Sequence, residues 1–156
     1  MLSSPSSYRF FSPHNKFLKQ PADISFIYFL KNMSTFRLNC LVHGETNDRT
    51  FPVDIPTNKT IGDLKKMIKI EKSPDFDQLT ADKLDLWKVN IPTHFPENPI
   101  LKVLNDNPMA DIESALKGVK TNPLSEIGDF WQEPAPKYNI HVIVKPPCKY
   151  HDWLIV

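Results

Sequence analysis

Hydrophobic and polar residues alternate in two neighbouring stretches of the chain, a pattern that predicts a pair of half-buried β-strands. The stretches are TFRLNCLV at 35–42 and FPVDI at 51–55, joined by a polar turn that contains Gly44. Pro52 has no backbone N–H to donate, which predicts that the second strand lies at an edge of its sheet. The residues expected to face the core are Phe36, Leu38, Cys40, Val42, Phe51, Val53 and Ile55.

The hydrophobic period changes from that of a strand to that of an α-helix directly after the second stretch. Thr60 and Asp63 have the spacing of an N-terminal capping box, and Pro74 is expected to stop the helix. The apolar stripe consists of Ile61, Leu64 and Ile68, and the lysines expected mostly on the other side are Lys65, Lys66 and Lys69. A solvated lysine face is the simpler interpretation of these lysines, and a partner-binding surface is the alternative.

A third alternating stretch, DKLDLWKVNI at 82–91, predicts another strand. Leu84 and Leu86 are expected to point inward, and by pattern alone they are interpreted as core residues. Trp87 interrupts the alternation, which predicts either a bulge or a strand that is covered on both faces.

Short helices and a final strand are predicted beyond a proline-interrupted segment. MADIESALKG at 109–118 predicts a short helix with Gly118 as its C-terminal cap, and NPLSEIGDFW at 122–131 predicts one further helical turn. YNIHVIVKPP at 138–147 is dense in β-branched residues and stops at Pro146. This composition predicts a strand in the middle of a sheet.

The order of predicted elements is β-β-α-β, short helices and a last β, which indicates an α+β fold of the ubiquitin-like β-grasp type. The first and last strands of that fold run parallel, and the chain supplies the long connection that parallel strands need. We expect the domain to span residues 34–147, with a short tail at 148–156. Residues 1–33 are expected to be a disordered N-terminal extension or a weak signal segment.

The segment before the domain contains one apolar run, from Ile24 to Leu30, preceded by Lys16 and Lys19. This arrangement is typical of the core of a secretory signal, but no small-x-small cleavage site follows it. An upstream extension, with translation starting at Met33, is the preferred interpretation, and a weak signal is the alternative. No run approaches the roughly 18 apolar residues of a bilayer span, so no membrane span is expected.

Charge and cysteine content narrow the function classes further. The 156 residues include 19 basic and 18 acidic side chains, which give a formal net charge of +1. Such a balance predicts no overall field that would attract nucleic acid or an anionic membrane. Two cysteines and five scattered histidines, without CxxC or HExxH, predict neither a metal site nor a cofactor. A disulfide between Cys40 and Cys148 is the less favoured alternative to two free thiols.

No catalytic constellation is predicted, and we expect the domain not to be an enzyme. His141 lies among Ile and Val in the last strand without a Ser or Cys at a recognisable spacing, so it is interpreted as structural. Asp82 and Asp85 flank the third strand and are interpreted as solvated. Conjugation to other proteins, as ubiquitin does, requires a C-terminal Gly-Gly, whereas this sequence ends HDWLIV and has no Gly after Gly128.

Four stretches of the chain, in combination, resemble the N-terminal domain of Crinkler effectors, proteins of oomycetes and of fungi that include root-colonising ones. The stretches are LNCLVHGETNDRTFPVDIPTNKTIGDLKKMIK, ADKLDLWKVNI, PLSEIGDFW and KYNIHVIVKPP, within about Met33 to Pro147. The resemblance implies a ubiquitin-like N-terminal domain, secretion, entry into host cells and, for many members, accumulation in the host nucleus. In oomycete members the third-strand region carries an LxLFLAK motif linked to translocation. Here Leu84 and Leu86 match, Trp87 replaces the Phe, and the following residues differ, as in the fungal variant.

The expected function is therefore that of the non-catalytic N-terminal module of a secreted effector, which mediates delivery into host cells and contacts unidentified host proteins. Members of the family usually carry a variable C-terminal effector domain after this N-terminal domain, and only nine residues follow Pro147 here. The sequence is expected to be either a protein that consists of the N-terminal domain alone or a truncated gene model. An intracellular ubiquitin-like adaptor or scaffold domain is the alternative function.

Overall fold

The computed structural model describes residues 24, 25, 27, 34–132 and 134–147. The chain divides into two compact units, Met1–Ser34 and Thr35–Val156. Residues 24, 25 and 27 are helical. The rest of the expected extension or signal segment lies outside the described residues, and so does the tail with Cys148. The second unit contains residues 35–147 of the predicted domain together with residues 148–156, so the division between domain and tail stays a prediction.

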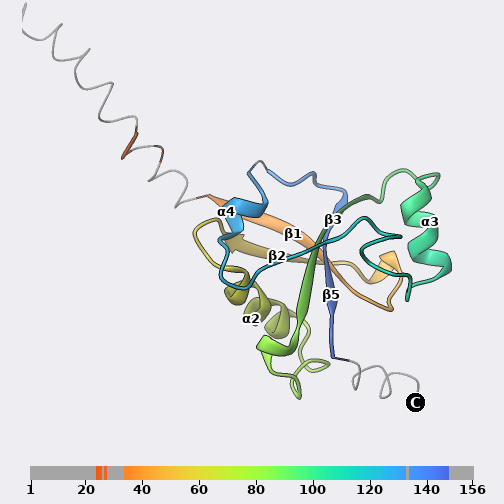
Figure 1. Cartoon of the computed structure of the whole chain (residues 1–156), viewed down its shortest axis with the longest axis horizontal. Helices are drawn as coiled ribbons and strands as arrows, with labels where there is room; N and C mark the ends of the chain where they lie inside the picture. The colour runs from red at the N-terminus through yellow and green to blue at the C-terminus, as the bar shows by residue number, and fades with distance from the viewer. Residues whose placement is uncertain (1–23, 26, 28–33, 133, 148–156) are drawn as a thin grey trace, which may run out of the picture. The chain divides into compact units, whose positions relative to one another are not determined.

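A five-stranded mixed sheet in the order β2-β1-β5-β3-β4 organises this unit (Figure 1). β1 pairs antiparallel with β2 and parallel with β5, and β5 pairs antiparallel with β3. The parallel pairing of the first and last strands at the centre of the sheet is the β-grasp arrangement, so the predicted α+β fold is confirmed. The strands are β1 (Thr35–Val42), β2 (Phe51–Pro56), β3 (Asp85–Pro92), β4 (Val119–Lys120) and β5 (Asn139–Lys145).

The edge and turn predictions for the first hairpin are confirmed as well. β2 forms one edge of the sheet, where Pro52 removes no ladder hydrogen bond. Gly44 has a φ of 99°, in the left-handed region that glycine adopts without strain. A short 3-10 helix, η1 (Asn47–Arg49), completes the connection between the two strands.

Both faces of the sheet are covered, by α2 (Ile61–Glu71) on one side and by α3 (Pro99–Asp106) on the other (Figure 1). This double cover explains why six of the seven residues of β5 are buried. Buried residues under α2 include Leu38, Cys40, Val53, Ile55, Leu64, Ile68, Leu84, Leu86, Val142 and Val144. Buried residues under α3 include Leu41, Val89, Ile91, Leu101, Leu104, Ile140 and Ile143.

The crossing helix α2 begins at the predicted capping box. Thr60 Oγ1 accepts a hydrogen bond from the Asp63 N–H at 3.2 Å, and the Asp63 carboxylate accepts one from the Thr60 N–H. The expectation that Lys65 is mostly solvated is wrong, because its side chain is buried. A second 3-10 helix, η2 (Ala81–Lys83), packs against α2.

The predicted helix at 109–118 is also wrong, since these residues form turns and the helix of this region is α3. Asn98 caps α3 by accepting hydrogen bonds from the N–H groups of residues 100 and 101, and Pro99 suits the first helical turn. Within 109–118, the chain leaves the helical region at Lys117, whose φ is 57°, and Gly118 N–H donates to the Ile112 carbonyl at 2.8 Å.

Gly118 is required for close packing, and we predict that Gly118→Ala destabilises the domain by about 1–3 kcal/mol. A Cβ atom at this position would lie 2.6 Å from Ile112 Cγ2 and 3.0 Å from the Ile112 carbonyl oxygen. Gly62→Ala is the matched control, because its Cβ would meet nothing closer than 3.4 Å. Urea unfolding of both variants measures the difference, and equal midpoints would contradict the close approach at Gly118.

Candidate functional site

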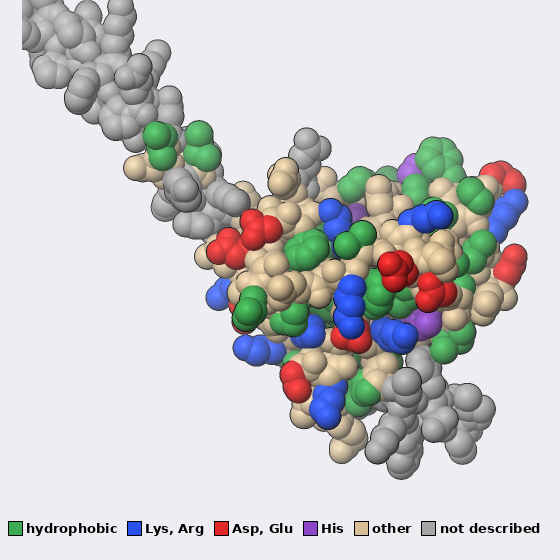
Figure 2. All heavy atoms as spheres, viewed as in Figure 1, with side chains coloured by type: hydrophobic (Ala, Val, Ile, Leu, Met, Phe, Trp, Pro, Cys, Tyr) green, Lys and Arg blue, Asp and Glu red, His purple; other side chains and the backbone are tan. Residues whose placement is uncertain are grey.

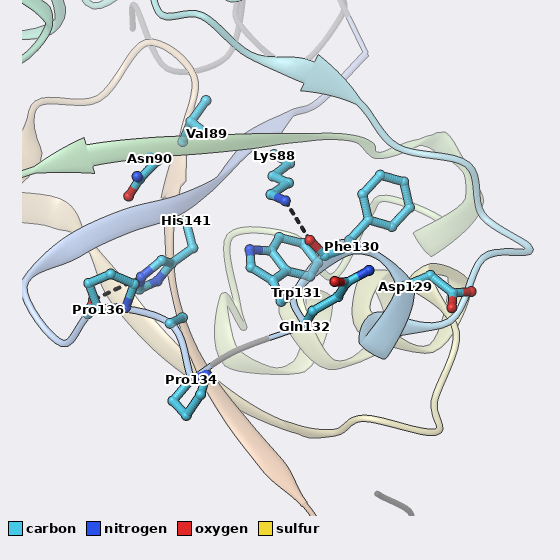
Figure 3. Close-up of a pocket in the computed structure, with 11 residues that line it drawn as sticks. Lys88, Val89, Asn90, Asp129, Phe130, Trp131, Gln132, Pro134, Pro136 and His141 are labelled. Carbon is cyan, nitrogen blue, oxygen red and sulfur yellow. Dashed lines mark hydrogen bonds between the residues drawn. The ribbon is translucent and has the colours of Figure 1, made fainter.

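A pocket of about 480 Å³ opens between β3 and the segment that joins α4 (Ile127–Phe130) to β5 (Figure 3). Lys88 and Asn90 reach it from β3, and His141 reaches it from β5. The other described lining residues are Val89, Asp129, Phe130, Trp131, Gln132, Pro134, Ala135 and Pro136. The pocket therefore combines polar groups from two strands with aromatic and proline side chains from one connection.

The position of α4 is fixed by backbone hydrogen bonds to the loop that precedes α2. The N–H groups of Ile127 and Gly128 donate to the carbonyl oxygens of Lys59 and Thr57, at 2.8 and 2.9 Å. Trp131 follows directly and is 6% exposed, packed into the core under α2. One wall of the pocket is consequently held by the core of the domain, while Pro134 and Pro136 continue the wall outward.

The ammonium group of Lys88 is the basic group of the pocket. Lys88 is partly buried, and its Nζ donates a hydrogen bond to the Phe130 carbonyl oxygen at the end of α4 (Figure 3). The same Nζ lies 5.8 Å from the centre of the Trp131 ring, within the range of a cation–π interaction. Both of these partners are neutral.

A short chain of amide groups orders the polar side of the pocket. Asn39 Nδ2 donates to the carbonyl oxygen of Asn139 at 2.8 Å, and Asn139 Nδ2 donates to Asn90 Oδ1 at 2.6 Å. Because the oxygen of Asn90 accepts this bond, its Nδ2 group is the end of the amide that remains to face outward. Asn139 is buried whereas Asn90 is exposed, so the chain leads from the sheet to the pocket surface.

His141 is a structural residue whose two ring nitrogens each bond to the backbone. Nδ1 accepts from the Asn39 N–H at 2.9 Å, which leaves Nε2 as the protonated nitrogen that donates to the Pro136 carbonyl oxygen at 2.9 Å. The ring thereby ties β1 to the segment before β5. Burial lowers the pKa of His141 below its usual range, and the bond to Pro136 opposes this shift only in part.

A pH dependence of stability follows from this arrangement. Because the folded-state pKa of His141 is depressed, the unfolded chain binds more protons below its own pKa of about 6.5. The stability that the neutral ring contributes is present above that pH and is lost as the pH falls through the folded-state pKa. We expect the urea midpoint to fall between about pH 7 and pH 5 in the native protein and to change less in His141→Asn.

His43, another buried histidine, is present in both proteins of this comparison, so the difference between their pH profiles reports His141 alone. Carboxylates with lowered pKa values, such as those of Asp54 and Asp63, titrate below this window. Identical profiles for the native protein and the variant would contradict the assignment.

The structure places the three residues matched to the translocation motif on two sides of the sheet. Leu84 and Leu86 are buried in the core under α2, 0% and 2% exposed, in agreement with their interpretation as core residues. Trp87 is half-buried and packs against the cluster under α3. The three therefore form no common surface, and a translocation role for them stays a prediction.

The interruption of the pattern at Trp87 is explained by one of the two predicted causes, the cover on both faces of β3, whereas the bulge lies after Trp87. β3 is covered on its two faces, and its pairing with β5 shifts register between Lys88 and Ile91. The indole Nε1 of Trp87 is buried without a hydrogen-bond partner among the described residues. The irregularity in β3 coincides with the stretch that carries Lys88 and Asn90 into the pocket.

Lys88, Asn90 and Trp131 were not anticipated as site residues from the sequence. The proline-rich stretch QEPAPK at 132–137 is a sequence signal for an extended connection, but it does not indicate which strand the connection packs against. The wall of the pocket forms only because the fold brings together residues about 40 positions apart in the chain, such as Lys88 and Phe130.

The side chains considered above for catalysis or metal binding lie in different parts of the domain. Cys40 is a free, fully buried thiol whose pKa is raised by burial, which suppresses its reactivity. Asp82 is exposed, and Asp85 pairs with Lys120 at 3.3 Å. Within the described part of the chain, no three His, Cys, Asp or Glu side chains are grouped as a metal would require. No described helix has the length and apolar character needed to cross a bilayer.

Charged side chains of both signs are mixed over the face of the molecule shown in Figure 2, with hydrophobic side chains between them. Basic residues do not merge into a continuous surface on that face. This distribution agrees with the near balance of 19 basic and 18 acidic residues in the chain.

Among solved structures, the C-terminal ubiquitin-like domain of mouse tubulin-specific chaperone e is similar to this chain, with a TM-score of 0.42 and 10% sequence identity. The similarity covers 73% of this chain and 88% of that one. A TM-score of this size adds nothing to the fold assignment, which rests on the strand order and on the parallel pairing of β1 with β5.

Two similarities in sequence bear on the family of this chain. Residues 36–145 match the family model described as the Crinkler effector protein N-terminal domain. Crinkler effector protein 1 of Rhizophagus irregularis is 32% identical over 110 residues, which are 70% of this chain and 21% of the relative. The chain thus spans about a fifth of the length of that relative. The match over 36–145, on a domain with the β-grasp strand order, shows that the chain belongs to the family of Crinkler effector N-terminal domains.

Proposed function

We propose that this domain is the non-catalytic N-terminal module of a secreted effector, which mediates delivery into host cells and contacts host proteins there, in the cytoplasm or the nucleus. The observation that carries the proposal is the family match over residues 36–145. The name of the Rhizophagus irregularis relative, an effector protein, supports the same assignment. Because the chain spans only about a fifth of that relative, any activity of the remaining length is outside the proposal.

The chemistry of the domain supports a binding role. The imidazole of His141 has both nitrogens bonded to backbone groups, and the thiol of Cys40 is buried with a raised pKa. A general base or nucleophile needs a free, accessible atom near its partner, and neither residue offers one. The domain is better suited to present a surface than to carry out a reaction.

We further propose that Leu84 and Leu86 serve delivery by maintaining the fold. Their side chains lie in the core under α2, where no partner reaches them in the folded domain. A receptor that reads this stretch in the folded state would contact exposed neighbours of the motif and not the two leucines. Direct recognition of the leucines would require the domain to open.

The test is localisation of the tagged chain. We expect a fluorescent fusion expressed by the organism that encodes the chain to be found outside its cells and within host tissue. Fusions that begin at Met1 and at Met33 separate a signal segment from an upstream extension. A fusion carrying Leu64→Asp controls for transport of misfolded protein. Retention of both native fusions inside the producing cell would contradict the proposal and favour the intracellular adaptor.

A further inference from the structure

The pocket between β3 and the α4–β5 connection contains a cation, Lys88, that has no anionic partner among the described residues. Lys88 Nζ is partly buried, and its hydrogen-bond and ring partners, the Phe130 carbonyl and the Trp131 indole, are neutral. Among the described residues, Lys88 takes part in none of the ion pairs within 4.0 Å. Partial burial of an ammonium group costs solvation energy, which an anion brought into the pocket would offset.

The pocket is also lined by two neutral amide side chains, those of Asn90 and Gln132. Asn90 presents Nδ2 outward, because Asn139 already occupies its oxygen. Gln132 is exposed on the opposite wall, and its side chain makes no hydrogen bond with a described residue. Ammonium and amide N–H groups can both donate to a carboxylate, and the charge-assisted bond from the ammonium is the stronger one.

The remaining walls are suited to an apolar group beside that carboxylate. Phe130 and Pro134 line the pocket with aromatic and proline surface (Figure 3), and Ala135 adds a methyl group to the lining. A volume of about 480 Å³ accommodates a few side chains and is open to solvent on one side. Asp129, the acidic residue among the described lining residues, is exposed and forms no ion pair with Lys88.

We propose that this pocket binds an acidic peptide segment of a partner protein, in which a Glu or Asp carboxylate contacts Lys88 and a neighbouring aliphatic side chain packs on Phe130. This inference assigns a binding site to the proposed contact with host proteins. It relies on the proposed function only for where the partner protein comes from. Binding itself is a property of the isolated chain in solution, so it is testable without secretion or a host.

The probe is the capped peptide Ac-Ser-Leu-Glu-Leu-Ser-NH₂, titrated into the ¹⁵N-labelled full-length chain and followed by NMR. We expect saturable shifts at the amides of Lys88 and Gln132 and at the Trp131 indole N–H. Two matched ligands are run in parallel, the Gln analogue of the peptide and acetate alone. We expect the Gln analogue to bind about tenfold more weakly, because it lacks the charge-assisted hydrogen bond, and acetate to require far higher concentrations.

Variants of the chain locate the binding. Lys88→Met keeps the aliphatic stem over Trp131 and removes the charge, and it is expected to weaken binding of the Glu peptide about tenfold without changing that of the Gln peptide. Gln132→Glu and Asp129→Asn alter exposed residues that do not support the core. Gln132→Glu is expected to weaken binding of the Glu peptide about twofold, and Asp129→Asn is expected to strengthen it about twofold. Lys120→Met is the matched control, since Lys120 pairs with Asp85 away from the pocket.

Several outcomes would overturn the inference. Equal affinity of the Glu and Gln peptides would remove the role of the carboxylate, and equal affinity of acetate would remove the role of the peptide. Shifts that map away from the pocket would place the site elsewhere. Binding seen only after Glu133→Gln would mean that the chain's own carboxylate neutralises Lys88 (Glu133 lies outside the described residues). If Lys88→Met does not fold, the opposite effects of Gln132→Glu and Asp129→Asn decide the question.

Discussion

Leu64→Asp is expected to leave the domain largely unfolded at 25 °C. Leu64 is 0% exposed at the centre of the contact between α2 and the sheet. A carboxyl group placed there loses the apolar contacts of Leu and has no hydrogen-bond partner, which together cost more than about 4 kcal/mol. That loss is comparable with the roughly 5–15 kcal/mol by which small domains are stable. Far-UV circular dichroism and urea unfolding measure it.

Lys66→Glu on the same helix is the control. The Lys66 side chain is 71% exposed and forms only a 3.5 Å ion pair with Asp63. Exchanging it is expected to change the stability by less than about 1 kcal/mol, even though the new Glu repels Asp63. Equal unfolding midpoints for the two variants would contradict the amphipathic assignment of α2.

Leu86→Ala is expected to destabilise the domain by about 2–5 kcal/mol, because it removes buried methyl groups and leaves a cavity next to the α2 face of the sheet. Leu86 is 2% exposed and belongs to the cluster that contains Leu84, Val142 and Val144. Urea unfolding monitored by tryptophan fluorescence gives the difference in free energy. The result also matters for delivery assays. A variant of this motif that is no longer delivered has to be compared with the native protein at the same folded fraction.

Leu124→Ala provides the matched control for Leu86→Ala. Leu124 is 86% exposed, so the same chemical change there is expected to shift the stability by no more than about 0.5 kcal/mol. If Leu86→Ala were as stable as Leu124→Ala but failed in delivery, Leu86 would act by direct recognition. The proposal that the leucines act through the fold would then be wrong.

Much of the fold was predictable because it is encoded in local patterns. The alternation at 35–42 and 51–55, the capping box at Thr60 and the β-branched run of the last strand each specify an element by the residues within it. The central position of β5 was predicted from its density of β-branched residues, and six of its seven residues are buried.

The errors arose where a residue's surroundings come from a distant part of the chain. Lys65 lies at the border of the apolar stripe of α2, four residues after Ile61, and it is buried where η2 packs against the helix. In the segment at 109–118, the apolar residues with helical spacing are Met109, Ile112 and Leu116. Ile112 and Leu116 are buried but are held in place by turns, and Met109 is 53% exposed. Apolar spacing alone does not separate a helix from a turn segment that packs on the same face.

The candidate pocket is the clearest example of a feature that depends on distant parts of the chain. Its lysine and asparagine come from β3, its histidine from β5 and its aromatic wall from α4, and no local pattern relates these stretches. The sequence by itself determined the elements, the edge strand and the core faces, because periodicity and capping act within about ten residues. Only the tertiary structure decided that both sheet faces are covered and that Lys88 meets Phe130. These features depend on contacts between segments far apart in the chain, about 40 residues in the case of Lys88 and Phe130, and no local period encodes such contacts.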